Sequence, residues 1–145
     1  MTAMPLANAS LLDEATAAAE AMIMFFNARS REMQKAGANV FLVSEDIYPQ
    51  TKHVIATRAK LLGIKVKECK ESEFTFTSEI FGAIVQYPNQ WGEVKDYKAM
   101  VTNAKANGSR IVVATDLMAL ALLTPTGEWG ADCVIGSTQR FGLPM

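Results

Sequence analysis

Two segments that are apolar on both faces constrain the fold of this chain more than any other feature. They are residues 80–87, IFGAIVQY, and residues 110–115, RIVVAT. A strand with one wet face alternates apolar and polar side chains, whereas a strand in the centre of a parallel sheet is apolar throughout. Between them, residues 94–101 open a predicted helix that Asn107 and Gly108 close. A strand, a helix and a second buried strand predict a right-handed crossover and parallel pairing.

The rest of the chain continues this alternation of helix and strand. We predict a helix from Leu11 to Lys35, a strand at 39–44, a helix from Pro49 to about Gly63, a strand at 64–69, a short helix at 117–123 and a strand at 132–137. Asn8 and Ser10 are candidate caps of the first helix, and residues 74–77 are either a short strand or a loop. The predicted fold class is α/β, a three-layer sandwich with a mainly parallel sheet, in one domain spanning residues 1–145.

Composition excludes several classes of protein. Half of the residues are hydrophobic, a fifth are charged, and the net charge is −1, so we expect neither nucleic acid nor a membrane as a partner. No apolar run reaches the roughly 20 residues that span a bilayer, and the first ten residues do not resemble a secretory signal. Cys69 and Cys133 stand alone, which favours free thiols in a reducing compartment and a cytoplasmic protein.

Polar residues follow each predicted strand, where ligands of open α/β sheets bind. They are Ser44, Glu45, Asp46, Gln86, Tyr87, Thr115, Asp116, Ser137, Thr138 and Gln139. A polar rim of this kind also occurs in α/β proteins with no ligand there. The chain contains no glycine-rich phosphate loop and no predicted metal site. Asp116 is the best single candidate for binding chemistry, although its position before the predicted helix at 117–123 also suits an N-cap.

Five motifs occur in an order that is typical of one family. They are PLANASLLDEATAAAEAM at 5–22, DIYPQT at 46–51, VQYP at 85–88, ATDLMAL at 114–120 and GEWGADCVIGSTQRFGLPM at 127–145. In sequence and spacing they resemble glycine dehydrogenase (decarboxylating), the P-protein of the glycine cleavage system. The resemblance covers nearly the whole chain. It points to a fragment of the amino-terminal half of that enzyme, the half without the cofactor-binding lysine.

The resemblance implies a function for the parent enzyme. It implies a pyridoxal-phosphate enzyme that decarboxylates glycine and passes the aminomethyl group to the lipoyl arm of H-protein, and a fold that is part of a pyridoxal-phosphate-dependent transferase-like large domain. Asp116 resembles the aspartate that pairs with the pyridine nitrogen, and so is a candidate cofactor-binding residue. Gln139 stands near the point where the other half carries its Schiff-base lysine, and an amide cannot form that bond. We therefore assign no catalytic residue, and we expect no covalently bound cofactor and no activity from the fragment alone.

The same resemblance implies partners. These are the lysine-bearing half of the P-protein and lipoylated H-protein, and an isolated fragment with an uncovered apolar surface is expected to self-associate. An alternative from another class remains open, namely a self-contained small flavodoxin-like binding or regulatory domain. Such a domain would end after a closing helix, whereas this chain ends just past a predicted strand, which favours the fragment.

Overall fold

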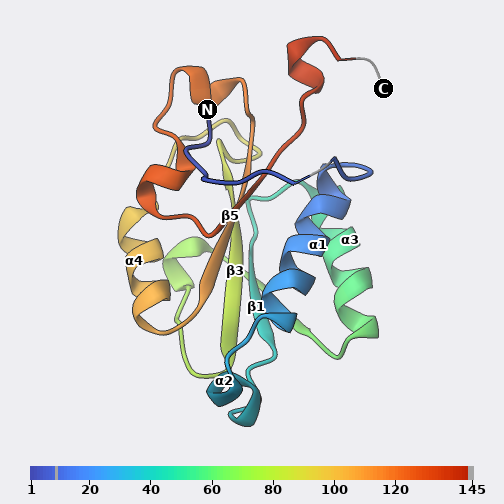
Figure 1. Cartoon of the computed structure of the whole chain (residues 1–145), viewed down its shortest axis with the longest axis vertical. Helices are drawn as coiled ribbons and strands as arrows, with labels where there is room; N and C mark the ends of the chain where they lie inside the picture. The colour runs from blue at the N-terminus through green and yellow to red at the C-terminus, as the bar shows by residue number, and fades with distance from the viewer. Residues whose placement is uncertain (9, 144–145) are drawn as a thin grey trace.

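A five-stranded parallel sheet with helices on both faces forms the protein (Figure 1). The computed structural model describes residues 1–8 and 10–143. The strands are β1 (Val40–Ser44), β2 (Lys65–Cys69), β3 (Ile80–Tyr87), β4 (Arg110–Thr115) and β5 (Cys133–Ile135). Their order across the sheet is β2-β1-β3-β4-β5, and every neighbouring pair is parallel. The predicted α/β class and parallel sheet are therefore confirmed.

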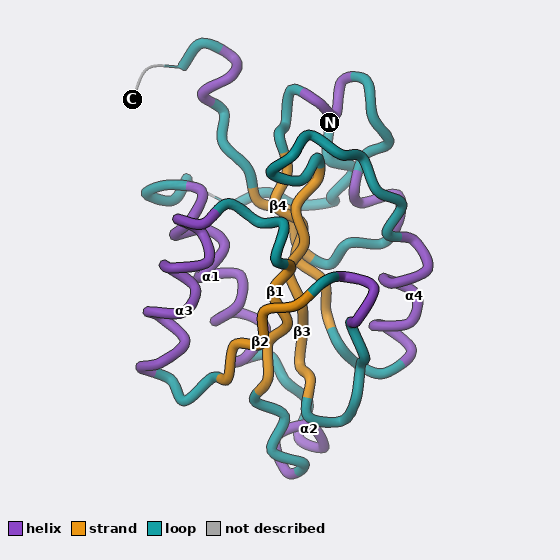
Figure 2. Tube along the Cα trace, turned by 180° about the vertical axis from the view of Figure 1, so that it is seen from behind, coloured by secondary structure: helices purple, strands orange, loops and turns teal. Residues whose placement is uncertain are grey.

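Helices form the outer two layers of the sandwich. They are α1 (Glu14–Asn27), α2 (Arg31–Lys35), α3 (Pro49–Leu61) and α4 (Lys98–Ala106), with short 3₁₀ helices η1 (Glu71–Glu73), η2 (Ala119–Ala121), η3 (Thr126–Trp129) and η4 (Gln139–Phe141). Helices α1 and α3 cover one face and α4 covers the other (Figure 1). Seen from behind, β2 lies at one edge of the sheet and β3 in its middle (Figure 2). The predictions of a buried central strand at 80–87 and an edge strand at 64–69 are both confirmed.

Small residues let α1 pack closely against the sheet. Ala18 and Ala19 of α1 are completely buried. Opposite them, a Cβ on Gly82 of β3 would lie 2.9 Å from the carbonyl oxygen of Arg110 and 3.3 Å from the ring of Phe25. Glycine at that position therefore admits the Phe25 ring between helix and sheet. The alanine-rich helix α1 therefore lies close against the sheet.

The first predicted helix is broken, so the expectation of one helix from Leu11 to Lys35 is wrong. Helix α1 begins only after Asp13, whose carboxylate accepts a hydrogen bond from the Thr16 amide at 2.6 Å. This makes Asp13 the N-cap, in place of the predicted Asn8 and Ser10. The chain leaves the helix after Asn27, where the Arg29 side chain donates to the carbonyl oxygens of Phe26 and Ala38 and Ser30 caps α2 by accepting the Met33 amide.

Two further predictions needed correction. The segment at 117–123 contains only the 3₁₀ helix η2 and not a short α-helix. Helix α4 begins at Lys98 and not at 94, because the Asp96 carboxylate accepts the Lys98 amide at 2.9 Å and so defines the first turn. Residues 74–77, which the sequence left open, form a loop.

Candidate functional site

The connections of the sheet reverse direction between β1 and β3. From β1 the chain crosses to β2 on one side, and from β3 it crosses to β4 on the other. Loops that follow β1 and β3 therefore diverge beyond the carboxyl ends of the strands. This is the point at which open α/β sheets bind ligands.

A lysine that sequence reasoning missed lies at the centre of this point. Lys95 Nζ lies 2.6 Å from Asp46 Oδ2, 3.2 Å from Glu71 Oε2 and 3.6 Å from Glu93 Oε2. Asp46 follows β1, Glu71 lies in η1 after β2, and both Glu93 and Lys95 lie in the loop after β3. The hydrogen bond from Lys95 lowers the pKa of the Asp46 carboxyl, and the same bond raises the pKa of Lys95. One ammonium group thus joins three loops; we call these four residues the Lys95 network.

The loop after β3 is fixed by its own hydrogen bonds. The Asn89 side chain accepts the amides of Trp91 and Glu93 at 3.0 and 2.9 Å and donates to Glu93 Oε2 at 2.8 Å. The Trp91 indole N–H donates to Asp46 Oδ1 at 3.1 Å, although the ring is 73% exposed. The Tyr87–Pro88 peptide bond at the start of this loop is cis. The structure therefore holds an exposed indole in a defined position.

An open cleft of about 590 Å³ lies beside the Lys95 network. Its charged lining consists of Glu45, Asp46, Lys70, Glu71, Lys95 and Asp96, so carboxylates outnumber ammonium groups. Burial and the charge of Glu71 raise the pKa of the Tyr97 hydroxyl that also lines it. The charged groups of the cleft sum to a net negative charge, which disfavours phosphate and other anions. Among the described residues, no group of histidine, cysteine, aspartate and glutamate side chains could hold a metal ion.

Asp116 follows β4. It lies at the same edge of the sheet as the Lys95 network, the edge formed by the carboxyl ends of the strands (the carboxyl edge), but on its other flank. Its Oδ1 accepts the Met118 amide at 3.0 Å, and its Oδ2 pairs with Arg140 Nη1 at 2.7 Å. Burial, followed by the charge of Asp116, raises the pKa of Glu14 at the start of α1. Asp116 thus accepts an amide within a turn and pairs with Arg140, but the α-helix at 117–123 that it was expected to cap is absent.

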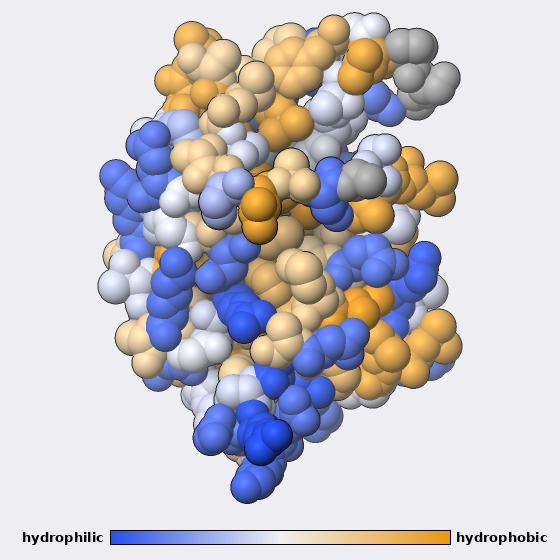
Figure 3. All heavy atoms as spheres, in the orientation of Figure 1, coloured by the Kyte–Doolittle hydropathy of each residue, from blue (hydrophilic) through white to orange (hydrophobic). Residues whose placement is uncertain are grey.

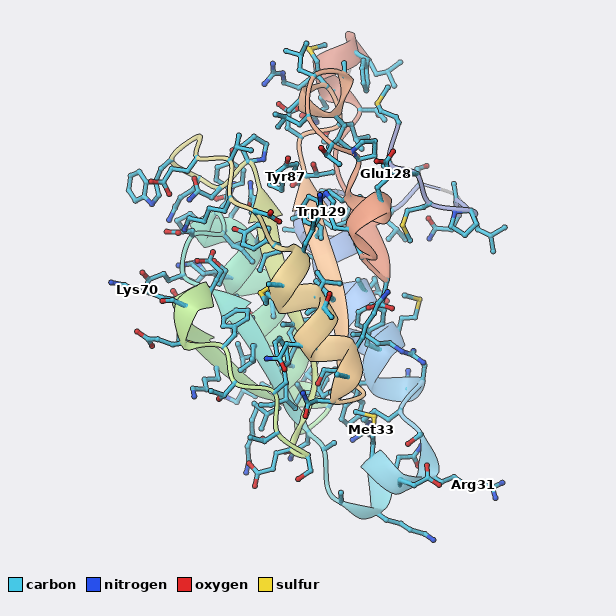
Figure 4. All side chains as sticks on the ribbon, turned by 90° about the vertical axis from the view of Figure 1, so that its left-hand side faces the viewer. Arg31, Met33, Lys70, Tyr87, Glu128 and Trp129 are labelled. Carbon is cyan, nitrogen blue, oxygen red and sulfur yellow. The ribbon has the colours of Figure 1, made fainter. Side chains whose placement is uncertain are left out.

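The structure brings some of the predicted rim residues together and separates others. Ser44, Glu45, Asp46 and Gln86 meet at the β1 and β3 ends, where the Ser44 hydroxyl donates to Glu71 and the Tyr48 amide donates to Gln86 Oε1. The Thr115 hydroxyl donates to the Tyr87 carbonyl at 2.7 Å. The Tyr87 ring itself turns toward Trp129, with ring centroids 4.7 Å apart (Figure 4). Ser137, Thr138 and Gln139 lie apart from these groups, and the last two are exposed.

Residues missed by sequence reasoning lie mostly in loops. Glu71, Asn89 and Lys95 carry no motif, and each contributes to the site only because separate loops meet. The one local signal was the dense polar stretch 89–96, NQWGEVKD, directly after a buried strand. The final two residues of the 127–145 motif, Pro144 and Met145, lie outside the described residues.

No helix in the described part of the chain is long and apolar enough to cross a membrane. Cys69 and Cys133 are both free thiols, as predicted, and burial raises the pKa of each.

Comparisons with known proteins agree with one another. The whole chain, residues 1–145, matches the family described as glycine cleavage system P-protein. Glycine dehydrogenase (decarboxylating) of Bacteroides thetaiotaomicron is 56% identical over 145 residues, and that of Vibrio cholerae is 52% identical. Each alignment covers all of this chain and 15% of the relative, so the chain spans only a small part of the length of these proteins.

Solved structures show the same likeness. A crystal structure of glycine decarboxylase (P-protein) of the glycine cleavage system, in inhibitor-bound form, matches 99% of this chain and 32% of its own with a TM-score of 0.84 and 28% identity. A putative O-acetylhomoserine (thiol)-lyase from Campylobacter jejuni, whose structure contains N'-pyridoxyl-lysine-5'-monophosphate, matches 83% of this chain and 30% of its own at a TM-score of 0.62 and 14% identity, which shows the fold alone. By sequence and by fold, the chain belongs to the family of the glycine cleavage system P-protein, of which it is a short piece.

Proposed function

We propose that this chain is a single α/β domain from the amino-terminal half of a glycine-decarboxylating P-protein. In this proposal the whole protein uses pyridoxal phosphate to decarboxylate glycine and passes the aminomethyl group to the lipoyl arm of H-protein. The observation that carries the proposal is an identity of 50 to 56% with glycine dehydrogenases over all 145 residues. The flavodoxin-like alternative shares the strand order β2-β1-β3-β4-β5, but the comparisons do not favour it.

The residues of this chain do not fit covalent capture of pyridoxal phosphate. Capture requires an amine for the Schiff base and hydrogen-bond donors for the phosphate, and a carboxylate usually pairs with the ring nitrogen. Gln139 supplies an amide instead of an amine, and the Asp116 carboxylate is already paired with Arg140 at 2.7 Å. In our proposal Asp116 is therefore a remnant cofactor-binding residue that now serves as a cap and ion-pair partner.

The role proposed for the chain within the parent is to support the lysine-bearing half. On the face shown in Figure 3, apolar residues predominate at the top, where the chain's C-terminal segment lies, whereas the bottom is hydrophilic. Leu6, Leu12 and Leu122 are each at least 87% exposed, and Phe141 and Leu143 follow β5 at 44% and 55%. We propose that the parent protein is cytoplasmic and that the rest of the P-protein covers these side chains. We also propose that the isolated chain self-associates through them. Light scattering checks this last point, and a monomer at high concentration would contradict it.

Full-length parent enzyme tests the activity. Purified parent with pyridoxal phosphate and lipoylated H-protein is expected to exchange labelled bicarbonate into the carboxyl group of glycine. The 145-residue chain with the same additions is expected to show none. Exchange by the chain alone would overturn the assignment of an inactive piece, and a parent without exchange would overturn the assigned activity.

Spectroscopy tests the cofactor directly in the isolated chain. On addition of pyridoxal phosphate we expect no stoichiometric Schiff-base absorption band, beyond slow reaction with surface lysines. Asp116→Asn serves as the matched variant, because it removes the carboxylate but keeps a similar shape. A stoichiometric band that Asp116→Asn abolishes would show a working cofactor site in this chain.

A further inference from the structure

A second pocket lies at the opposite end of the sheet from the Lys95 network. It has a volume of about 230 Å³, and its lining includes Phe25, Arg29, Met33, Phe81 and Arg110. Met33 belongs to α2, at the end of the molecule far from Tyr87 and Trp129 (Figure 4). Phe25 and Phe81 are almost fully buried, so the accessible apolar lining comes from Ala28 and Met33. The two arginines supply positive charge at its wall.

Both guanidinium groups lie over aromatic rings. The Arg29 guanidinium carbon is 3.4 Å from the centroid of the Phe26 ring, and that of Arg110 is 5.7 Å from the centroid of Phe25. Stacking uses the flat face of a guanidinium and leaves its N–H edge available for a planar acceptor. The rings therefore orient the two arginines without consuming their hydrogen-bond donors.

Neither arginine is neutralised in the described structure. Arg29 Nε and Nη1 donate to two backbone carbonyls, and no acceptor for its Nη2 lies within residues 1–8 and 10–143. Over the same residues no carboxylate lies within ion-pair distance of Arg29 or Arg110, whereas Arg58 and Arg140 each have one. Burial lowers the pKa of Arg29, yet a guanidinium stays charged at neutral pH. A half-buried cation of this kind is stabilised when an anion pairs with it.

We propose that this pocket binds a carboxylate attached to a small apolar group, with the carboxylate between Arg29 and Arg110 and the apolar group against Ala28 and Met33. The volume is below the 300 Å³ or so of pockets for drug-sized ligands, so the ligand is small. Such a carboxylate has two sources, a free small molecule or an acidic side chain of the parent protein. The pocket is separate from the carboxyl edge, and its existence does not depend on the proposed function.

Benzoate is the probe, because it joins a carboxylate to a small flat apolar group. Titration into the ¹⁵N-labelled chain is expected to give saturable shifts of the Ser30, Met33 and Gly108 amides. Benzyl alcohol, which has the ring without the charge, should not shift them comparably. Equal shifts with benzyl alcohol would overturn the proposal.

Two arginine variants make the test specific. Arg110→Gln is expected to weaken benzoate binding about tenfold or more, because it removes one charged donor pair from an exposed position. Arg140→Gln, at the other end of the sheet, should bind benzoate like the wild type. Amide spectra of both variants verify folding. Unchanged affinity of a folded Arg110→Gln would overturn the proposal.

The full-length parent distinguishes the two sources by calorimetric titration with benzoate. Binding to both the chain and the parent, lost in each with Arg110→Gln, assigns the pocket to a free carboxylate. Binding to the chain alone shows that the rest of the parent closes or fills the pocket, which excludes a free carboxylate as its ligand there. Binding to neither overturns the proposal and leaves the proposed enzymatic function untouched.

Discussion

The two flanks of the carboxyl edge each contain an ion pair of nearly the same length, yet the two pairs differ in what they hold together. Lys95 lies 2.6 Å from Asp46, and Arg140 lies 2.7 Å from Asp116. The side chains of Asp46 and Lys95 are 16% and 35% exposed, and those of Asp116 and Arg140 are 28% and 63% exposed. Breaking the less exposed pair leaves charges without a partner where water reaches them less easily, but a more exposed pair exchanges its partner for water. Ion-pair distance therefore does not rank the contributions of these pairs.

Backbone contact, more than charge, fixes the flank of Asp116. A Cβ on Gly136 would lie 2.5 Å from the carbonyl oxygen of Thr115. The Asp116 amide and the Thr115 hydroxyl both donate to the Tyr87 carbonyl, at 3.3 and 2.7 Å. The flank of the Lys95 network is thus held by side-chain charges, and the flank of Asp116 by close approach of the main chain. Substitutions can distinguish these two kinds of contribution.

The largest effect is expected from Gly136→Ala. The added methyl group has no room against the Thr115 carbonyl oxygen, so strands β4 and β5 must move apart. We expect a loss of about 3 kcal/mol in the free energy of unfolding, the upper range for overpacking. Urea unfolding measures it, with Ser137→Ala as the neighbouring control at less than about 1 kcal/mol. Equal losses in the two variants would show that close approach does not hold this flank.

Lys95→Met is expected to lower the free energy of unfolding by about 2 kcal/mol. The three carboxylates of the Lys95 network then face one another without a cation. Lys98→Met is the matched control, since Lys98 is exposed and forms no ion pair within the described residues. Its change should stay within about 0.5 kcal/mol. Urea unfolding at neutral pH distinguishes the two, and a Lys95→Met variant as stable as the control would refute the role given to the network.

Lowering the pH should change the contributions of Asp46 and Glu14 to the free energy of unfolding in opposite directions. The pKa of Asp46 is lowered from 3.8 in the folded state, so its contribution to stability is present above pH 3.8 and is lost as the pH falls through the lower value. The advantage of wild type over Lys95→Met should therefore shrink below about pH 3.8. The pKa of Glu14 is raised from 4.5, so its contribution is present below pH 4.5 and is lost as the pH rises through the higher value. The stability of Glu14→Gln relative to wild type should therefore increase as the pH rises above 4.5. If the free energies of unfolding of wild type, Lys95→Met and Glu14→Gln vary with pH in the same way, both assignments are contradicted.

The smallest effects are expected from the exposed pair. Arg140→Ala should cost about 0.5 kcal/mol, and Asp116→Asn at most about 1 kcal/mol, the scale of a weakened cap. The double variant should show a coupling below about 0.5 kcal/mol. Coupling of several kcal/mol in this cycle would show that the Asp116 flank resembles the Lys95 network after all.

Much of the fold could be predicted because it depends on patterns a few residues long. The continuous apolar run 80–87 and the alternating run 64–69 correctly placed a central and an edge strand. The break between α1 and α2 could not be predicted in this way. The Arg29 guanidinium reaches the Ala38 carbonyl, nine residues further along, which no periodicity records, and Ser30 caps α2 by a local contact that periodicity also does not register.

The candidate site was only half predictable for the same reason. Asp46 and Asp116 were accessible to sequence reasoning because each directly follows a buried strand. Lys95 was not, since its partners Asp46 and Glu71 lie 49 and 24 residues away and meet it only after the sheet has formed. The ion pair between Asp116 and Arg140 could not be predicted either, because nothing in the sequence distinguishes Arg140 from other surface arginines.

The two tryptophans give each part of this surface its own optical reporter. Trp129 is packed between Tyr87 and Tyr97 and is 8% exposed, so its fluorescence emission should lie at shorter wavelength than that of a solvated indole. Trp91 is 73% exposed and donates its indole N–H to Asp46, which places a wet fluorophore directly on a titrating carboxylate. We therefore expect emission at long wavelength to follow the protonation of Asp46, and emission at short wavelength to follow the packing of β3 against η3. A single emission spectrum reads out both at once.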